Sequence, residues 1–346
     1  MMRLAAIQFF ATPFDRDRNL DTAGRLAGEA AAQGAQCVVL PELFNTGYVY
    51  SSRLTQAAED EDGPTLAWLR ERSAALGAHL GGTLLLRQAG HVYNVFVLAA
   101  PDGGLQRYAK RHPFLWERCF FEPGAQPAIA ETALGRLGLL VCWDAAQPAA
   151  WAAYAGRVDA VLVASAPARF HRAVLNFPAG QKAYLAQLMP ALLRQREALD
   201  GLYSTHIAAC AAALRVPVAH AVMAGRFVTR LPFPRFSLLC AAWRTPRYWP
   251  LARAAPLASL RATFYGGSTV YDARGVALAQ VEAQPSGQVG GLIGGEEGLA
   301  VAAVEPGAAG GQAGAAPRPG VPAELRLFER LLQPLAAGAY RKRGNF

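Results

Sequence analysis

The chain lacks the features that mark membrane, disulfide-rich and zinc-binding proteins. No apolar run reaches the ~20 residues that a membrane-spanning helix needs. Residues 1–8 read as a first strand and lack the long apolar core and cleavage site of a signal peptide, so we expect a cytoplasmic location. The five cysteines are odd in number and scattered, which argues against a disulfide framework. The six histidines form no HxxxH pair, so a dedicated zinc site is not expected.

Charged residues are also few. They make up 17% of the chain against 53% hydrophobic residues, which is the balance of a folded protein. A length of 346 residues is enough for one large domain or two small ones. The net charge of +9 comes mostly from arginines in one mid-chain segment and in the tail. No recognisable nucleic-acid-binding module accompanies this charge, so we expect no nucleic-acid partner.

The first part of the chain alternates between apolar strands and amphipathic helices. Residues 3–9 and 36–40 read as strands, separated by a helix over 19–32 whose small apolar residues share one face. A helix over 64–77 and a strand hairpin over 79–100 follow. This order predicts a layered α/β domain that carries its functional groups at the ends of strands.

Two charged residues come directly after or at the end of predicted strands. Glu42 is either a solvated turn residue or a carboxylate at the floor of a cleft. Lys110 alone would be an ordinary exposed strand end. The loop after it, however, places Glu117 among Phe114, Trp116, Phe120 and Phe121. An acid and a lysine among aromatic residues indicate a partly desolvated pocket, where charges shift one another's pKa.

A later predicted strand, over 135–141, is followed directly by Cys142. Core packing alone could explain a free cysteine at this position, because free Cys is among the most buried residue types. A thiol is a poor nucleophile until a carboxylate takes its proton, and an ammonium can stabilise both the thiolate and the oxyanion that its attack creates. Glu42, Lys110 and Cys142 would supply these groups, with the amide N–H of Trp143 as a second oxyanion donor.

The motifs in this order resemble those of the nitrilase superfamily of carbon–nitrogen hydrolases, over most of residues 3–305. The matching pieces are Asn19-Leu20 to Gly34-Ala35, Pro41-Glu42-Leu43, Tyr108-Ala109-Lys110, Glu117, Phe121-Glu122-Pro123-Gly124, Gly138 to Asp144 and Gly267 to Gly275. The resemblance implies an α/β fold, an α-β-β-α sandwich of the carbon–nitrogen hydrolase type. It also implies a homodimer or higher homo-oligomer in which sheets pair into four-layered cores.

The resemblance further implies a Glu–Lys–Cys triad, with Glu42 as general base, Lys110 as oxyanion stabiliser and Cys142 as nucleophile. Glu117 matches the second glutamate, which helps to position the substrate and the triad. For substrate contacts we expect Tyr48, Trp116 and Trp143. The implied course passes through a thioester on the cysteine, and no metal or organic cofactor is implied.

The sequence departs from the family pattern just after the nucleophile. Ala146 and Ala149 stand where many amidase members carry Arg and Glu. Trp143, the residue after the cysteine, resembles the pattern of the true nitrilases. We therefore expect a hydrolase acting on a small amide or N-carbamoyl compound, with a nitrilase as the second interpretation. A membrane-surface acyltransferase and a non-catalytic binding protein on the same fold remain as lower alternatives.

Two segments have unusual length or composition. Residues 166–200 are longer than is usual for the family, and residues 226–261 hold seven arginines, five prolines and no acid. The second segment is expected to be an insertion that acts as a lid, a partner surface or a contact for anionic lipid, or has no specific role. Residues 306–322 are predicted to form a flexible linker, and residues 323–346 a C-terminal helix and basic tail.

Overall fold

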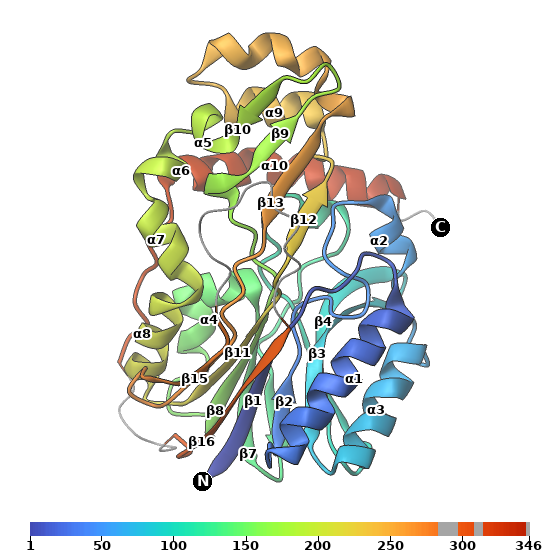
Figure 1. Cartoon of the computed structure of the whole chain (residues 1–346), viewed down its shortest axis with the longest axis vertical. Coiled ribbons are helices and arrows are strands. Elements are labelled where there is room, and N and C mark those ends of the chain that lie inside the picture. Colours follow the sequence, from blue (N-terminus) through green and yellow to red (C-terminus); the bar gives the residue numbers. More distant parts are fainter. Residues whose placement is uncertain (283–296, 308–313, 344–346) are drawn as a thin grey trace.

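The computed structural model describes residues 1–282, 297–307 and 314–343, and two six-stranded sheets form its larger part (Figure 1). The first sheet contains, in spatial order, β16 Gly298–Val304, β1 Met2–Gln8, β2 Cys37–Val39, β3 His79–Gln88, β4 His91–Ala99 and β5 Leu105–Ala109. The second contains β15 Ala277–Gln280, β14 Thr269–Tyr271, β11 Val218–Val222, β8 Ala160–Ser165, β7 Gly135–Val141 and β6 Ile129–Thr132.

The two sheets pack face to face and are covered by helices on their outer faces. Leu4 and Leu98 of the first sheet share one buried cluster with Leu139 and Leu162 of the second. The helices α1 Arg16–Ala32 and α3 Pro64–Leu76 cover the first sheet, and α4 Pro148–Ala152 and α8 Thr205–Leu214 cover the second. The expected α-β-β-α sandwich is confirmed.

The covering helices follow the sequence pattern closely. Helix α1 begins at Arg16, three residues before the predicted start, because the Asp15 side chain caps it by accepting from the Arg18 N–H. Its buried face is formed by small residues such as Ala23 and Ala27, which allow close packing on the sheet. The strand pair predicted over 79–100 is the β3–β4 hairpin.

Strand direction brings the predicted site residues to one end of the sandwich. Strand β2 is parallel to β3, and β4 is antiparallel to both β3 and β5, so β5 runs in the direction of β2. Glu42 and Lys110 therefore follow strand ends at the same edge of the first sheet. Cys142 follows β7 in the facing sheet.

A second layer, which we call the cap, covers this end of the sandwich. Its four-stranded sheet has the order β10 Lys182–Tyr184, β9 Val174–Asn176, β13 Ser259–Thr263 and β12 Arg226–Thr229. Antiparallel pairing of β9 with β13 joins the two unusual segments, 166–200 and 226–261, into one structure. We use the name cap for residues 168–203 and 226–263.

Short helices complete the cap. They are α5 Leu185–Leu188, α6 Ala191–Arg194, α7 Arg196–Asp200, α9 Pro234–Ala241 and the 3-10 helices η3 Phe170–Arg172, η4 Gly201–Tyr203, η5 Pro246–Arg253 and η6 Ala255–Leu257. Pro190 lies between α5 and α6, where a proline interrupts a continuous helix. Proline also keeps the arginine-rich segment to short helices, as its density predicts.

The last helix, α10 Ala323–Arg343, runs between the cap and the sandwich (Figure 1). It occupies most of the segment 323–346 and continues through Pro334. Its Phe328 ring packs against Trp116 at 5.6 Å, and its Tyr340 hydroxyl accepts a hydrogen bond of 2.7 Å from the Val92 N–H. The helix is thus part of the roof over the predicted site. Of the predicted linker 306–322, residues 308–313 lie outside the described residues.

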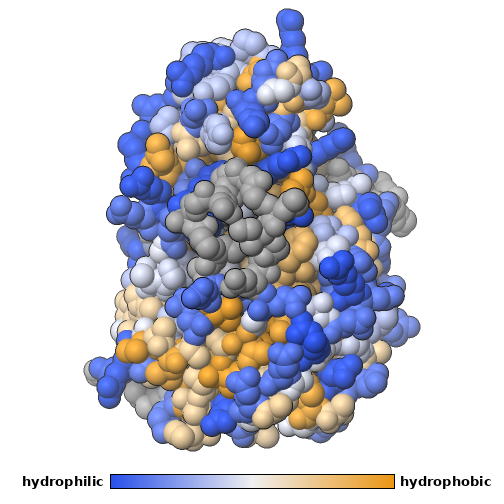
Figure 2. All heavy atoms as spheres, viewed as in Figure 1, coloured by the Kyte–Doolittle hydropathy of each residue, from blue (hydrophilic) through white to orange (hydrophobic). Residues whose placement is uncertain are grey.

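The surface is mixed in character. Figure 2 shows apolar atoms gathered in the lower half of one face, in the region of β15 and β16, where Val276 and Leu278 are exposed. Across residues 1–282, 297–307 and 314–343, no helix combines the length and apolar character that crossing a membrane requires.

Candidate active site

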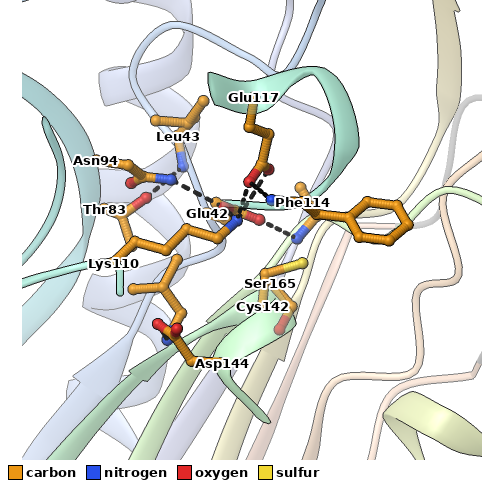
Figure 3. A network of polar contacts seen from close by, with 12 residues as sticks. Glu42, Leu43, Thr83, Asn94, Lys110, Phe114, Glu117, Cys142, Asp144 and Ser165 are labelled. Atoms are coloured by element: carbon orange, nitrogen blue, oxygen red, sulfur yellow. Dashed lines mark hydrogen bonds and ion pairs between the residues drawn. The ribbon is translucent and has the colours of Figure 1, made fainter. Parts of the chain in front are cut away.

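Glu42, Lys110, Glu117 and Cys142 converge at the end of the sandwich beneath the cap (Figure 3). The Lys110 ammonium lies between two carboxylates, with Nζ 2.8 Å from Glu42 Oε1 and 2.7 Å from Glu117 Oε2. All three side chains are buried. Buried charges persist only when they are paired and hydrogen-bonded. Each of these three residues therefore depends on the other two to remain buried.

Each carboxylate has further donors. Glu42 accepts from the Asn94 amide at 2.9 Å through Oε1 and from the Ala166 backbone N–H at 2.9 Å through Oε2. Glu117 accepts from the Tyr48 hydroxyl and, at 2.6 Å, from the Phe114 backbone N–H. These bonds fix both carboxylates around Lys110.

The backbone is strained where the site residues are presented. Three of the non-glycine residues with positive φ angles lie at or next to the site: Leu43 at 50°, Leu115 at 47° and Cys142 itself at 47°. Such conformations cost energy and persist only when neighbouring contacts hold them. For Leu43 the contact is a 2.8 Å bond from its N–H to the Thr83 hydroxyl. The strain at Cys142 turns the chain sharply from β7 into the 3-10 helix η2 Cys142–Ala146.

Neighbouring groups fix the loops that carry Lys110 and Cys142. The Gly124 N–H donates to the Lys110 carbonyl at 2.8 Å, and a Cβ at Gly124 would lie 2.2 Å from the Ala109 carbonyl oxygen, so only glycine fits there. Asp144 accepts from the Tyr108 hydroxyl at 2.9 Å and from the His112 N–H at 2.8 Å. Asp144 therefore links the cysteine turn to the strand that carries the lysine.

The Cys142 thiol is protonated in the resting site. Burial raises its pKa well above the usual value, the Glu42 carboxylate raises it further, and Lys110 opposes both. The Tyr203 hydroxyl, 3.6 Å from Sγ, also lowers it. A thiol with this pKa must lose its proton to a neighbouring base as it attacks, and the carboxylate of Glu42 is suited to take it.

The charges around Lys110 keep it protonated. Burial alone would lower its pKa, but Glu117 and Glu42 outweigh that effect, and the pKa is raised well above its ordinary value. For Glu117, burial raises the pKa to about 7, although Lys110 acts in the opposite direction. The site therefore holds a permanent ammonium between a base and a second carboxyl group of weakened acidity.

A cavity of about 50 Å³ opens onto Cys142. Tyr48 and Trp143, two of the three expected substrate contacts, line it together with Glu117. Trp116, the third, does not line this cavity. Its indole N–H donates to the Ser237 hydroxyl at 3.0 Å, and its ring packs against Tyr50 and Phe328. Trp116 thus joins the loop of Glu117 to the cap and α10.

The sequence interpretation missed the residues that the cap and α10 contribute. The cavity is also lined by Phe170, His171, Leu192, Leu199, Leu202 and Tyr203 of the cap and by Leu325 of α10. For the four residues within segment 166–200, the signal was the unusual length of that segment; Leu202, Tyr203 and Leu325 lie outside it. Asn94, which holds Glu42, was hidden inside a strand that reads as apolar.

Helix α10 also reaches the place where the sequence departs from the family pattern. Ala149 is exposed, and Ala146 lies beside a surface hollow lined by Arg326, Glu329 and Arg330 of α10. Glu329 is hydrogen-bonded to the Trp143 side chain and to the Leu115 backbone. Charged side chains of the C-terminal helix therefore lie beside Ala146.

The chain is similar to known carbon–nitrogen hydrolases. The carbon–nitrogen hydrolase family profile matches residues 3–305. A nitrilase from Pyrococcus abyssi is 32% identical over 148 residues, which are 42% of this chain and 56% of that protein. An omega-amidase from Xenopus tropicalis is 31% identical over 153 residues, which are 41% of this chain and 55% of that protein. The match thus spans little more than half the length of these relatives.

Solved structures share the fold over a longer stretch. A cysteine-to-serine variant of the Nesterenkonia AN1 amidase from the nitrilase superfamily has a TM-score of 0.60 at 24% identity, covering 87% of this chain and 90% of that one. A protein of the same superfamily from Xanthomonas campestris has a TM-score of 0.59 at 23% identity, covering 87% and 89%. On the family match across residues 3–305, the chain belongs to the carbon–nitrogen hydrolase family, the nitrilase superfamily.

Proposed function

We propose that this protein is a cysteine-dependent amidase that hydrolyses the carbon–nitrogen bond of a small amide or N-carbamoyl compound through a thioester. The observation that carries the proposal is the buried Glu42–Lys110–Glu117 unit beside the cavity that holds Cys142. A binding protein gains nothing from two carboxylates, an ammonium and a strained thiol at such a desolvation cost. Curated relatives that include amidases support the same conclusion.

In the first half-reaction, Sγ of Cys142 attacks the amide carbon while Glu42 takes the thiol proton. The carbonyl oxygen becomes an oxyanion, which the Lys110 ammonium and the Trp143 N–H stabilise. The proton held by Glu42 passes to the nitrogen as the carbon–nitrogen bond breaks. Ammonia or an amine leaves, and the acyl group remains on sulfur as a thioester.

In the second half-reaction, a water molecule attacks the thioester carbon and Glu42 takes one of its protons. Collapse of the second oxyanion breaks the carbon–sulfur bond, and the thiolate regains its proton. Glu117 accepts a hydrogen bond from Lys110, so its role is to hold the ammonium in position. The net reaction consumes one water and yields a carboxylic acid.

A nitrilase is the second candidate, because the same thiol and ammonium can act on a nitrile carbon and a nitrilase is among the relatives. Ammonia release from paired substrates, such as an amide and the nitrile with the same carbon chain, separates the two. Turnover of the amides supports the amidase proposal. Turnover of nitriles with no activity on any amide would overturn it.

The lower alternative, an acyltransferase at a membrane surface, rests on the exposed tip of the cap. Trp243 and Trp249 are about half exposed there, next to Arg244 and Arg247. Aromatic residues with arginines are typical of interfacial contacts. Co-sedimentation with anionic vesicles, comparing wild type with Trp243→Ala/Trp249→Ala, tests this alternative. Absence of lipid binding by wild type removes it.

We also propose a homodimer, supported by the exposed apolar region around β15 in Figure 2. Sedimentation of Leu278→Glu against wild type tests it. The variant is expected to be monomeric at a concentration at which the wild type is dimeric. A monomeric wild type contradicts this proposal.

A further inference from the structure

A second cavity lies under the cap beside the one that holds Cys142. Its volume is about 30 Å³. Its wall includes Leu115 and Trp116 of η1 Leu115–Cys119, Leu175 of β9, Leu238 and Ala241 of α9, and Phe328 of α10. We call this space the rear chamber and the cavity at Cys142 the front chamber.

The rear chamber offers no free polar group among the residues that line it. Its one polar side chain is Ser237, whose hydroxyl donates to the Pro232 carbonyl at 2.7 Å and accepts from the Trp116 indole at 3.0 Å. Water in a cavity is stable when it finds two to four polar partners, and hydrocarbon-lined cavities stay dry and bind apolar groups. The rear chamber is therefore suited to hydrocarbon.

The two chambers share part of their walls. Phe170, Leu192 and Leu325 line both of them, and they come from η3, α6 and α10. Side-chain rotamers change rapidly compared with backbone rearrangement. A ligand in the front chamber can therefore extend into the rear chamber when these side chains turn, with no opening of the cap.

The front chamber has no cation that could bind a substrate carboxylate among its described lining residues. Lys110 is paired with two carboxylates. The nearby Arg169 guanidinium bonds to Asp200 at 3.0 Å and to the Tyr265 carbonyl at 3.2 Å. His171, which does line the chamber, has its pKa lowered by burial and is neutral near pH 7. An acidic acyl group would lose its hydration here and would find only neutral groups, such as the Tyr50 hydroxyl and His171 Nδ1, which have no hydrogen-bond partner among the described residues.

From these observations we infer that the preferred substrate is an amide with an uncharged, apolar acyl group, a medium-length alkyl or phenylalkyl chain whose far end occupies the rear chamber. This inference rests on the proposed function and specifies its substrate class. The chamber accommodates on the order of two or three groups the size of a water molecule. Each methylene that enters it should raise kcat/KM about fourfold, the value of one buried methylene group.

A series of linear amides tests the inference. Ammonia release is measured for acetamide, butanamide, hexanamide and octanamide, and for adipamate, the six-carbon chain that ends in a carboxylate. We expect kcat/KM to rise by at least ~20-fold from acetamide to hexanamide, and adipamate to be at least ~10-fold poorer than hexanamide. A flat profile, or a preference for adipamate, overturns the inference and leaves amide hydrolysis standing.

Binding decides the question separately from catalysis. Calorimetry with the Cys142→Ala protein compares hexanamide, acetamide and adipamate, and hexanamide should bind at least ~10-fold more tightly than either. If the wild type hydrolyses none of the amides, the proposed function fails. Tighter binding of hexanamide then still supports the chamber assignment, and equal binding overturns it.

Two variants of α9 change the rear chamber in opposite directions. Ala241→Leu fills it and should lower the hexanamide-to-acetamide ratio of kcat/KM by at least ~5-fold, while Leu238→Ala enlarges it and should move the preference to octanamide. Leu239→Ala is the matched control, because Leu239 is exposed on the same helix and lines neither chamber. A chain-length preference that all three variants leave unchanged would contradict the assignment.

Discussion

The floor and the roof of the front chamber are built on opposite principles. On the floor, Glu42, Lys110 and Glu117 are ionisable, buried and hydrogen-bonded to one another and to fixed donors. The roof consists of side chains of the cap and of α10 that are almost entirely apolar. The floor comes from the ends of sandwich strands and the loop of Glu117, and the roof comes from the cap and α10.

This difference separates chemistry from selectivity. On the floor, loss of one partner leaves another charge buried and unpaired, so few substitutions are tolerated. In the roof, one apolar side chain can replace another of similar volume at small cost. The roof also excludes water, which strengthens the electrostatic interactions on the floor. We therefore expect floor variants to lose turnover, and roof variants to change which substrate is preferred.

The largest effect is expected for Cys142→Ala. Removing the proposed nucleophile should lower kcat for amide hydrolysis by at least ~10⁴-fold, because no other described residue that lines the front chamber carries a thiol. Ammonia release under single-substrate saturation measures this effect. Cys240→Ala, a partly exposed cysteine of α9, is the matched control and should stay within about twofold of wild type. Comparable losses in both variants would remove the distinction between floor and roof.

The next effect is expected for Glu42→Gln. The amide keeps the shape and one acceptor oxygen but cannot take the thiol proton, so kcat should fall by ~10²–10⁴-fold. The proper measurement combines kcat with the rate of Cys142 alkylation, since both need the base. Glu131→Gln, an exposed glutamate of β6, serves as control. A Glu42→Gln variant with wild-type kcat would exclude Glu42 as the base.

The pH dependence of stability tests the electrostatic state of the floor. The raised pKa of Glu117, caused first by burial, means that the folded protein binds a proton that the unfolded chain releases between pH 4.5 and about 7. Relative to Glu117→Gln, the free energy of unfolding of wild type should therefore fall across this window as the pH rises, by on the order of 2 kcal/mol. Urea unfolding of both proteins at pH 5 and pH 8 measures the difference. A difference that grows with pH would contradict the assigned direction.

The smallest effect concerns Tyr203, where the roof touches the nucleophile. Its hydroxyl lies 3.6 Å from Sγ and lowers the Cys142 pKa. Tyr203→Phe should raise that pKa and reduce kcat/KM by about fivefold, the value of one weak hydrogen bond. The pH profile of Cys142 alkylation should move to higher pH. Loss of packing alone does not predict this change. Tyr184→Phe, on the cap surface, is the control. An unchanged pH profile would leave Tyr203 as a packing residue.

Much of the floor could be predicted from the sequence. Local patterns show where β2 and β7 end, and Glu42 and Cys142 follow these ends directly in the chain. The aromatic loop around Glu117 also indicated burial. The α-β-β-α fold was predictable for the same reason, since the alternation of strands and helices is a local signal.

The roof could not be predicted, because it depends on pairing between distant segments. Nothing local in Val174–Asn176 indicates that it pairs with Ser259–Thr263, some eighty residues later. Leu325 reads as one more leucine of a C-terminal helix, yet it lines both chambers. Trp116 was expected to contact the substrate because its loop is rich in aromatic residues. The structure places it instead where the loop of Glu117 meets the cap and α10.

Intact-mass spectrometry of the protein, quenched in acid during hydrolysis of hexanamide, tests the central claim most directly. The account predicts an adduct on Cys142 whose mass equals that of the acyl group less the thiol hydrogen. The adduct should be absent in Cys142→Ala. In Glu42→Gln, slower deacylation should increase the fraction of protein that carries the adduct after long incubation. Hydrolysis without any adduct on Cys142, and with turnover retained in Cys142→Ala, would contradict it.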